Sequence, residues 1–138
     1  MLRPLLPGAL AMMLAACGSE PSAPVAVEDS APNAPVVVTA QMGEAIFRRC
    51  VACHTVDKGG RNGVGPNLHG VVGRAVGSHP GFAYSPAMRA KGGVWDEAAL
   101  DTYLKAPAQA LPGGRMAFAG IPEAAERKAV ILYLAAQK

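Results

Sequence analysis

The run Cys50-Val51-Ala52-Cys53-His54 constrains this chain more than any other feature of its sequence. Residues three apart on a helical turn face the same side, so both thiols point in one direction with the imidazole beside them. Three kinds of site use such a cluster: a redox-active dithiol, a structural zinc ion, or a porphyrin bonded to both sulfurs. The rest of the sequence separates these three possibilities.

Two of the possibilities lack the residues that they need. A structural zinc ion takes four ligands, and beyond the cluster the sequence offers only His69 and His79, with no second cysteine pair at zinc-finger spacing. A thioredoxin-like dithiol belongs to a βαβ unit, and no strand pattern surrounds Cys50. Cys-x-x-Cys-His is the attachment sequence of c-type haem. We therefore expect one covalent haem c on Cys50 and Cys53, with His54 binding the iron.

The amino-acid composition agrees with a bound apolar cofactor. The 138 residues fit one globular domain with short additional segments. Aromatic residues make up only 5% of the chain, while it contains 16 Gly and 12 Pro. Something other than aromatic side chains must fill the centre, and a haem would supply that apolar mass.

The N-terminal region has the features of an export signal. Residues 1–16 carry one charge at Arg3 and continue as an apolar run that is too short to span a bilayer. The run ends in Leu14-Ala15-Ala16-Cys17, which resembles the lipobox of bacterial lipoproteins. That resemblance implies that Cys17 is acylated and becomes the mature N-terminus, anchoring the protein to a membrane. The alternative is an ordinary cleavage site at which Cys17 is incidental.

Three segments follow from these patterns. We expect a lipoprotein signal peptide over residues 1–16, the acylated Cys17 with a Pro/Ala-rich linker over 17–38, and a folded domain over 39–138. From residue 39 onward the sequence has 12 Lys and Arg against 7 Asp and Glu, whereas the whole chain has a net charge of +3. A moderately basic domain suits docking to acidic redox partners, although a generic solvated surface is an equal alternative.

Three helices are expected in the folded domain. The first follows Thr39 as N-cap and leads into the haem-attachment run, and Gly43 would let it cross the last helix closely. The second follows Asp96 and stops before Pro107, and the third runs from Pro122 nearly to the C-terminus. Residues 55–93 are expected to form Gly-rich loop with a short helix near 85–89. The side chains expected on the buried helix faces are Met42, Ile46, Phe47, Leu100, Tyr103, Leu104, Ala129, Val130, Leu132 and Tyr133.

Further motifs recur in a fixed order and spacing around the haem-attachment run. They are Gly43, Phe47, Gly65-Pro66-Asn67-Leu68-His69-Gly70, Arg74, Gly81-Phe82-Ala83-Tyr84, Trp95, Tyr103-Leu104-Lys105-Ala106-Pro107 and Pro112-Gly113-Gly114-Arg115-Met116-Ala117-Phe118-Ala119-Gly120-Ile121. Together they resemble the class I cytochrome c family, in the branch that includes mitochondrial cytochrome c. The resemblance covers about residues 39–138. It implies an all-α fold of three main helices and Gly-rich loops wrapped around one covalently bound haem.

The resemblance also implies a second iron ligand, Met116, opposite His54. Its position in a Gly/Pro-rich loop between two helical stretches independently makes Met116 a candidate, because such backbone can bend to aim a side chain. A lone Met is more often a core residue, and His69 and His79 are rival ligands. Ligation by imidazole and thioether would fill both axial positions and favour the ferrous state.

The same resemblance implies roles for six supporting residues. The Pro66 carbonyl would accept a hydrogen bond from His54, and the Tyr103 hydroxyl would approach the Met116 sulfur. Arg74, Tyr84 and Trp95 would donate hydrogen bonds to the haem propionates, and Phe118 would shield the haem face. Each has a plainer reading as a turn, a solvated charge or a core residue.

The implied function is electron transport by a monomeric carrier on the periplasmic side of a bacterial membrane. Its haem would cycle between ferric and ferrous states in a respiratory or photosynthetic chain. Its partners would be redox proteins, namely a quinol–cytochrome c reductase and a terminal oxidase or reductase, and not nucleic acid. Two alternatives stay open: a haem enzyme or a sensor of gas or peroxide with a labile Met116, and a fixed subunit of an oxidase complex.

Overall fold

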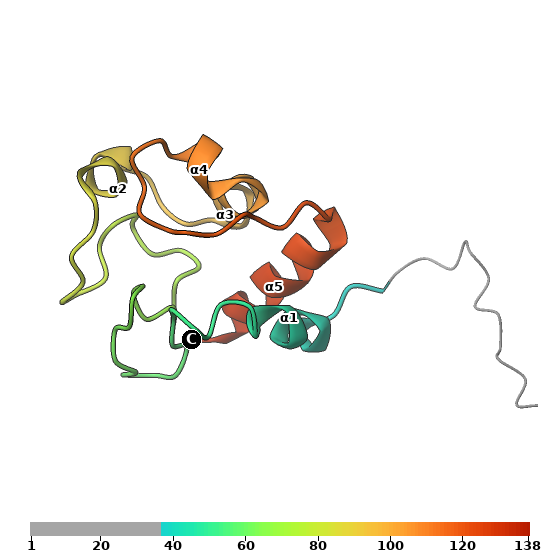
Figure 1. The fold of residues 1–138 in the computed structure, drawn as a ribbon. Helices are drawn as coiled ribbons and strands as arrows, with labels where there is room; N and C mark the ends of the chain where they lie inside the picture. Colours follow the sequence, from blue (N-terminus) through green and yellow to red (C-terminus); the bar gives the residue numbers. More distant parts are fainter. Residues whose placement is uncertain (1–36) are drawn as a thin grey trace, which may run out of the picture. The chain divides into compact units, whose positions relative to one another are not determined.

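The computed structural model describes residues 37–138 (Figure 1). The expected signal peptide, Cys17 and all but the last two residues of the expected linker lie outside this range. The helices are α1 (Ala40–Phe47), α2 (Pro86–Lys91), α3 (Glu97–Lys105), α4 (Pro107–Ala110) and α5 (Ala124–Ala136). The described part contains no β-strand, only one isolated bridge between Ala75 and Val94. The expected all-α fold with three main helices, α1, α3 and α5, is therefore confirmed.

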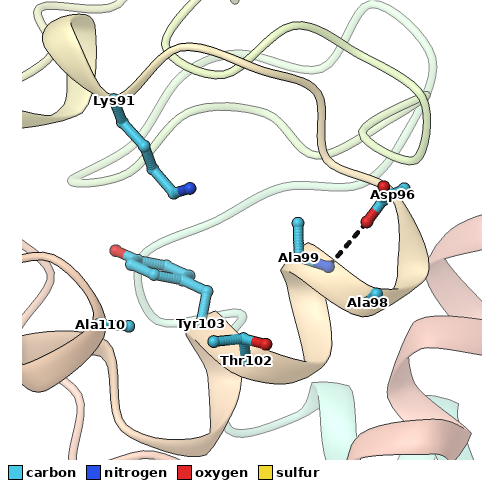
Figure 2. A pocket seen from close by; sticks show the side chains of 7 residues that line it. All are labelled: Lys91, Asp96, Ala98, Ala99, Thr102, Tyr103 and Ala110. Carbon is cyan, nitrogen blue, oxygen red and sulfur yellow. Dashed lines mark hydrogen bonds between the residues drawn. The ribbon is translucent and has the colours of Figure 1, made fainter.

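The helices begin where the capping residues of the sequence indicate. The Thr39 hydroxyl accepts a hydrogen bond from the Met42 amide at 3.3 Å, and Ser85 caps α2 in the same way. Figure 2 shows the Asp96 carboxylate accepting from the Ala99 amide, at 2.7 Å, at the start of α3. Each contact satisfies an amide that has no partner within its helix, which stabilises that helix end.

Two details of the helical pattern were not predicted correctly. The last helix begins at Ala124 and not at Pro122, because the intervening Glu123 has an extended backbone at φ −75° and ψ 120°. The short helix α4 was not expected at all. It starts directly after α3 with Pro107 at its first position, where a proline has no hydrogen bond to lose.

The helices α1 and α5 cross at close range, and they lie side by side in Figure 1. A Cβ atom on Gly43 would lie 2.0 Å from the Ala129 carbonyl oxygen, so no other residue fits at this crossing. Near the crossing, the rings of Phe47 and Tyr133 pack with their centroids 5.2 Å apart. The crossing expected from Gly43 is confirmed.

The buried face of α5 differs slightly from the expected one. Ala129 and Val130 are buried as predicted, at 0% and 1% exposure, but Leu132 and Tyr133 are only half-buried. The buried core of the described part consists of Phe47, Val71, Val76, Trp95, Leu100, Tyr103, Ile121, Val130, Ile131 and Leu134. Among residues 37–138, no helix combines the length and apolar character needed to cross a membrane.

Candidate functional site

A largely apolar cavity of about 410 Å³ lies inside the folded unit, and residues from the end of α1, from α2, α3 and α5 and from three loops line it. All ten residues proposed from the sequence as cofactor contacts are among those lining it: Cys50, Cys53, His54, Pro66, Arg74, Tyr84, Trp95, Tyr103, Met116 and Phe118. The rival ligands His69 and His79 do not line it. The fold thus brings residues separated by up to 68 positions in the sequence to one place.

The two thiols sit on a helix-like turn that follows α1. The amides of Cys53 and His54 donate to the Cys50 carbonyl at 3.0 and 2.9 Å, so the turn keeps helical hydrogen bonding beyond Phe47. Both cysteines carry free thiols and line the cavity. Burial raises the pKa of the Cys50 thiol. The same-side arrangement expected from the three-residue spacing is present.

His54 is held in one tautomer by its neighbours. Its Nδ1 lies 2.7 Å from the Pro66 carbonyl oxygen, and since a carbonyl can only accept, Nδ1 donates its hydrogen there. The Nε2 atom therefore keeps its lone pair, as a metal ligand must. Burial lowers the pKa of His54, which favours the neutral ring. Gly65 packs so closely that a Cβ there would lie 2.2 Å from the His54 Cε1 atom.

Asn67 supports this arrangement and was not singled out from the sequence. Its side chain is fully buried at 2% exposure and donates to the Thr55 hydroxyl and the Asp57 carbonyl at 2.7 and 3.0 Å. Its Oδ1 accepts from the His69 amide at 2.9 Å. These bonds fix the loop that follows Pro66. The one feature of the sequence that pointed to Asn67 was its place in the motif that begins with Gly65-Pro66.

Arg74 and Tyr84 bring hydrogen-bond donors to the cavity. The Arg74 guanidinium donates to the carbonyls of Asn67 and His69 and to His79 Nδ1, at 3.0 to 3.1 Å. A guanidinium has five N–H groups, so others are free to meet a buried anion. The Tyr84 hydroxyl accepts from the His79 amide at 3.3 Å, which leaves its own hydrogen to donate.

Trp95 and Tyr103 form an aromatic pair in the cavity wall. Their ring centroids are 5.0 Å apart with the planes tilted by 48°, and both side chains are 7% exposed. Burial raises the pKa of Tyr103, so its hydroxyl keeps its hydrogen. Tyr103 also lines a second hollow of about 420 Å³ at the surface, where Figure 2 shows it facing Lys91. The Lys91 ammonium lies 5.6 Å from the Trp95 ring centroid, within the range of a cation–π contact.

Met116 lies in the loop between α4 and α5, residues 111–123, which we call the Met116 loop. The Met116 side chain is half-buried and lines the cavity, as does that of Phe118. The Arg49 guanidinium lies 5.7 Å from the Phe118 ring centroid. Among residues 37–138, no three His, Cys, Asp or Glu side chains gather as a metal site. His54 brings an imidazole nitrogen to the cavity, and Met116 and Met88 each bring a thioether sulfur.

These residues fit a haem c. The cavity offers free thiols for thioether bonds, a neutral imidazole with an available Nε2, a thioether, and donors for the two propionates. A buried anion without donors would be strongly destabilising, and Arg74 and Tyr84 provide them.

Comparisons with known proteins agree with this fit. The family model described as cytochrome c matches residues 40–138 of the chain. The chain belongs to the cytochrome c family. It is 45% identical to cytochrome c2 of Rhodoblastus acidophilus over 67% of this chain and 86% of that one. It is 42% identical to cytochrome c of Kluyveromyces lactis over 67% of this chain and 84% of the other.

A solved structure in the same family has the same fold. Cytochrome cH from Methylobacterium extorquens superposes with a TM-score of 0.67 at 40% identity, covering 71% of this chain and 98% of that one. Like cytochrome c2 and cytochrome c, the chain is an electron carrier of a respiratory or photosynthetic chain and not an enzyme. Its cofactor is covalently bound haem c, and its partners are redox proteins.

Proposed function

We propose that this cytochrome c attaches its haem through Cys50 and Cys53 and holds the iron between His54 and Met116. The observation that supports the proposal is the convergence of all ten candidate residues on one cavity of about 410 Å³. The hydrogen bond of 2.7 Å between His54 Nδ1 and the Pro66 carbonyl oxygen adds to it, because it places the ring hydrogen on Nδ1 and leaves the lone pair of Nε2 for a metal.

The bound haem supplies a one-electron couple between ferric and ferrous iron. The role of this chain's residues is to hold that couple in one geometry and to exclude competing chemistry. His54 and Met116 would both bind the iron and leave it no open position for a substrate, which favours outer-sphere electron transfer. The Met116 sulfur favours ferrous iron and so raises the reduction potential. Phe118, Trp95 and Tyr103 line the cavity with aromatic rings, which would limit the access of water to the haem.

We assign the haem propionates to the side of the cavity that carries Arg74, Tyr84 and Trp95. Arg74 is supported by three hydrogen bonds to the protein, so its guanidinium is fixed before the anion arrives. Replacing Arg74 by Gln would leave a propionate short of a charged donor. The expected result is a less stable holoprotein with a shifted reduction potential, compared with a control, Arg61→Gln, at an exposed residue that does not line the cavity.

Two measurements test the attachment and the ligands. Acid–acetone extraction should leave the pigment on the polypeptide in the wild-type protein and release it after joint replacement of Cys50 and Cys53 by Ser. The ferric wild-type protein should show the weak charge-transfer band between sulfur and iron, and Met116→Ala should lack it. Replacing Met88, another methionine that lines the cavity, by Leu is the matched control and should retain the band.

Carbon monoxide binding separates the carrier from a protein whose Met116 is labile. If His54 and Met116 both bind the iron, the ferrous wild-type protein should bind carbon monoxide poorly, and Met116→Ala should bind it readily. Ready binding by the wild-type protein would contradict stable ligation by Met116.

We further infer that the protein is a lipoprotein on the periplasmic side of a bacterial membrane, anchored through Cys17. The support is the lipobox-like run before Cys17 and the family match, which begins only at residue 40. A fatty-acid label should enter the wild-type protein and not Cys17→Ser, and osmotic shock should release the Cys17→Ser protein.

We propose that the redox partners of the protein are a quinol–cytochrome c reductase and a terminal oxidase or reductase. Co-purification from solubilised membranes would reveal a permanent complex.

A further inference from the structure

A buried arginine outside the haem cavity has no part in the proposed function so far. Arg127 lies in α5 and is 6% exposed, although arginine is rarely buried unless it is paired. Its Nε donates to the Asp101 carboxylate at 2.7 Å, and Asp101 belongs to α3. Its Nη1 donates to the carbonyls of Ile121 and Pro122 at 2.9 and 2.7 Å. We call this set of four residues the Arg127 clamp.

The clamp fastens one end of the Met116 loop. Ile121 is 1% exposed, and its amide donates to the Leu104 carbonyl near the end of α3 at 2.8 Å. Gly120 has φ +100° and packs so tightly that a Cβ there would lie 2.3 Å from the Lys105 carbonyl oxygen. The last residues of the loop are thus joined to α3 by backbone contacts and to α5 through Arg127.

The part of the loop that carries Met116 has far fewer restraints. Its side chains from 112 to 119 are exposed except for Met116 and Phe118, which are half-buried. The backbone bonds near them are local, from Gly114 to Leu111 and from Phe118 to Met116. The position of the Met116 sulfur therefore depends on where the ends of the loop are fixed.

We propose that Arg127 is a positioning residue for Met116: by fixing the C-terminal end of the Met116 loop to α3, the clamp favours the state in which the sulfur is bound over the state in which it has left the iron. The inference rests on the proposed ligation by Met116. Losing one or two charge-assisted hydrogen bonds at such a joint should raise the equilibrium constant for Met116 dissociation about 10- to 100-fold.

Imidazole, which competes with Met116 for ferric iron, measures that equilibrium. In the full holoprotein, Arg127→Gln should bind imidazole about 10- to 100-fold more tightly than the wild type. It should also show a weaker sulfur–iron band and a lower reduction potential. Arg127→Lys should bind imidazole with an affinity between those of the wild type and Arg127→Gln, because lysine keeps the charge but lacks the branched guanidinium that donates to several acceptors at once. Asp101→Asn, at a side chain that is 44% exposed, tests the same joint if Arg127→Gln does not fold.

Two control variants separate positioning from general stability. Lys128→Gln removes a charge from the adjacent exposed residue and should leave imidazole affinity unchanged. Ile46→Ala weakens the core at α1, far along the chain from the loop, and should lower stability to urea without tightening imidazole binding in proportion. If imidazole affinity follows stability equally in Ile46→Ala and Arg127→Gln, the clamp is only structural and the proposal is wrong.

The outcomes also distinguish this inference from the proposed function. A wild-type ferric protein without the sulfur–iron band would refute ligation by Met116, and the clamp proposal with it. A wild-type protein with the band, and unchanged imidazole affinity in both Arg127→Gln and Asp101→Asn, would refute the clamp alone.

Discussion

At the scale of single residues, the site depends on how closely Gly65 approaches His54. A Cβ at residue 65 would meet three atoms of the imidazole ring at 2.2 to 2.7 Å. Gly65→Ala should therefore displace the ring, weaken its hydrogen bond to Pro66 and destabilise the protein by about 1–3 kcal/mol. The absorption spectrum and urea unfolding of the holoprotein would measure both effects.

Gly59→Ala provides the matched control for that substitution. No atom lies within 4 Å of a Cβ at residue 59, but its φ of +71° disfavours alanine. We expect Gly59→Ala to lower the free energy of unfolding by about 1 kcal/mol through its backbone conformation alone, with an unchanged haem spectrum. Equal spectra for Gly65→Ala and the wild type would show that the His54 ring tolerates the added methyl group.

His79 should make stability depend on pH. Burial and the nearby Arg74 charge lower its pKa below the ordinary value of about 6.5. The unfolded chain then binds the proton more readily, so this contribution to stability is present above about pH 6.5 and is lost as the pH falls through the lower folded pKa. The groups that contact His79 are the Arg74 guanidinium and the Tyr84 hydroxyl.

His79→Gln isolates that contribution, because the other titrating groups are common to both proteins. As the pH falls from 7.5 to 5, the free energy of unfolding of the wild type should decrease relative to that of His79→Gln, as measured by urea unfolding at each pH. A difference that stays constant over this range would contradict the predicted role.

At the scale of helices, the close crossing of α1 and α5 should reverse the effect that helix propensity alone predicts for replacing Gly43. Gly43→Ala should stabilise an isolated helix by about 1 kcal/mol. In the protein the new Cβ would lie 2.0 Å from the Ala129 carbonyl oxygen, a backbone atom that cannot move without shifting α5. We expect a net loss of about 3 kcal/mol or more in urea unfolding. Gln41→Ala, on the exposed face of α1, should change stability by about 0.5 kcal/mol or less.

The helices also show what a sequence can and cannot predict. Thr39 and Asp96 could be predicted as N-caps because their side chains accept from amides only three residues away, so the interaction depends on nearby sequence alone. The same reasoning did not find α4 or Asn67. The α4 helix is a single turn closed by local bonds to the Ala106 and Pro107 carbonyls, too short for a helical pattern in the sequence. Asn67 depends on contacts beyond its own turn, because its side chain donates to residues 10 and 12 positions away.

The site was predictable for a different reason. The attachment run carries its geometry in its spacing, so Cys50, Cys53 and His54 needed no knowledge of the fold. The Gly/Pro-rich loop around Met116 made it a candidate ligand, but only the resemblance to a family set it apart from a methionine of the core and indicated the supporting residues. Arg127 gave no signal, since an arginine in a helix usually faces solvent and its burial comes from the packing of α3, α5 and the Met116 loop.

At the scale of the whole molecule, the excess of basic residues from residue 39 onward predicts how the carrier meets charged reagents. At low ionic strength a positive domain attracts anions over about one Debye length, roughly 10 Å at 0.1 M salt. Oxidation of the ferrous protein by anionic hexacyanoferrate should therefore slow as salt is added. Oxidation by a cationic cobalt complex should become faster, since salt screens the repulsion.

The position of the charge decides whether this steering acts at the site. Arg115 is exposed and lines the haem cavity beside Met116, whereas Lys128 is exposed on α5 and does not line it. Both Arg115→Gln and Lys128→Gln lower the net charge equally. If attraction is focused at the cavity mouth, Arg115→Gln should slow hexacyanoferrate oxidation severalfold more than Lys128→Gln in stopped-flow measurements at low salt. Equal slowing by both variants would mean that only the total charge matters, because a reagent steered by the overall field does not distinguish where one charge was removed.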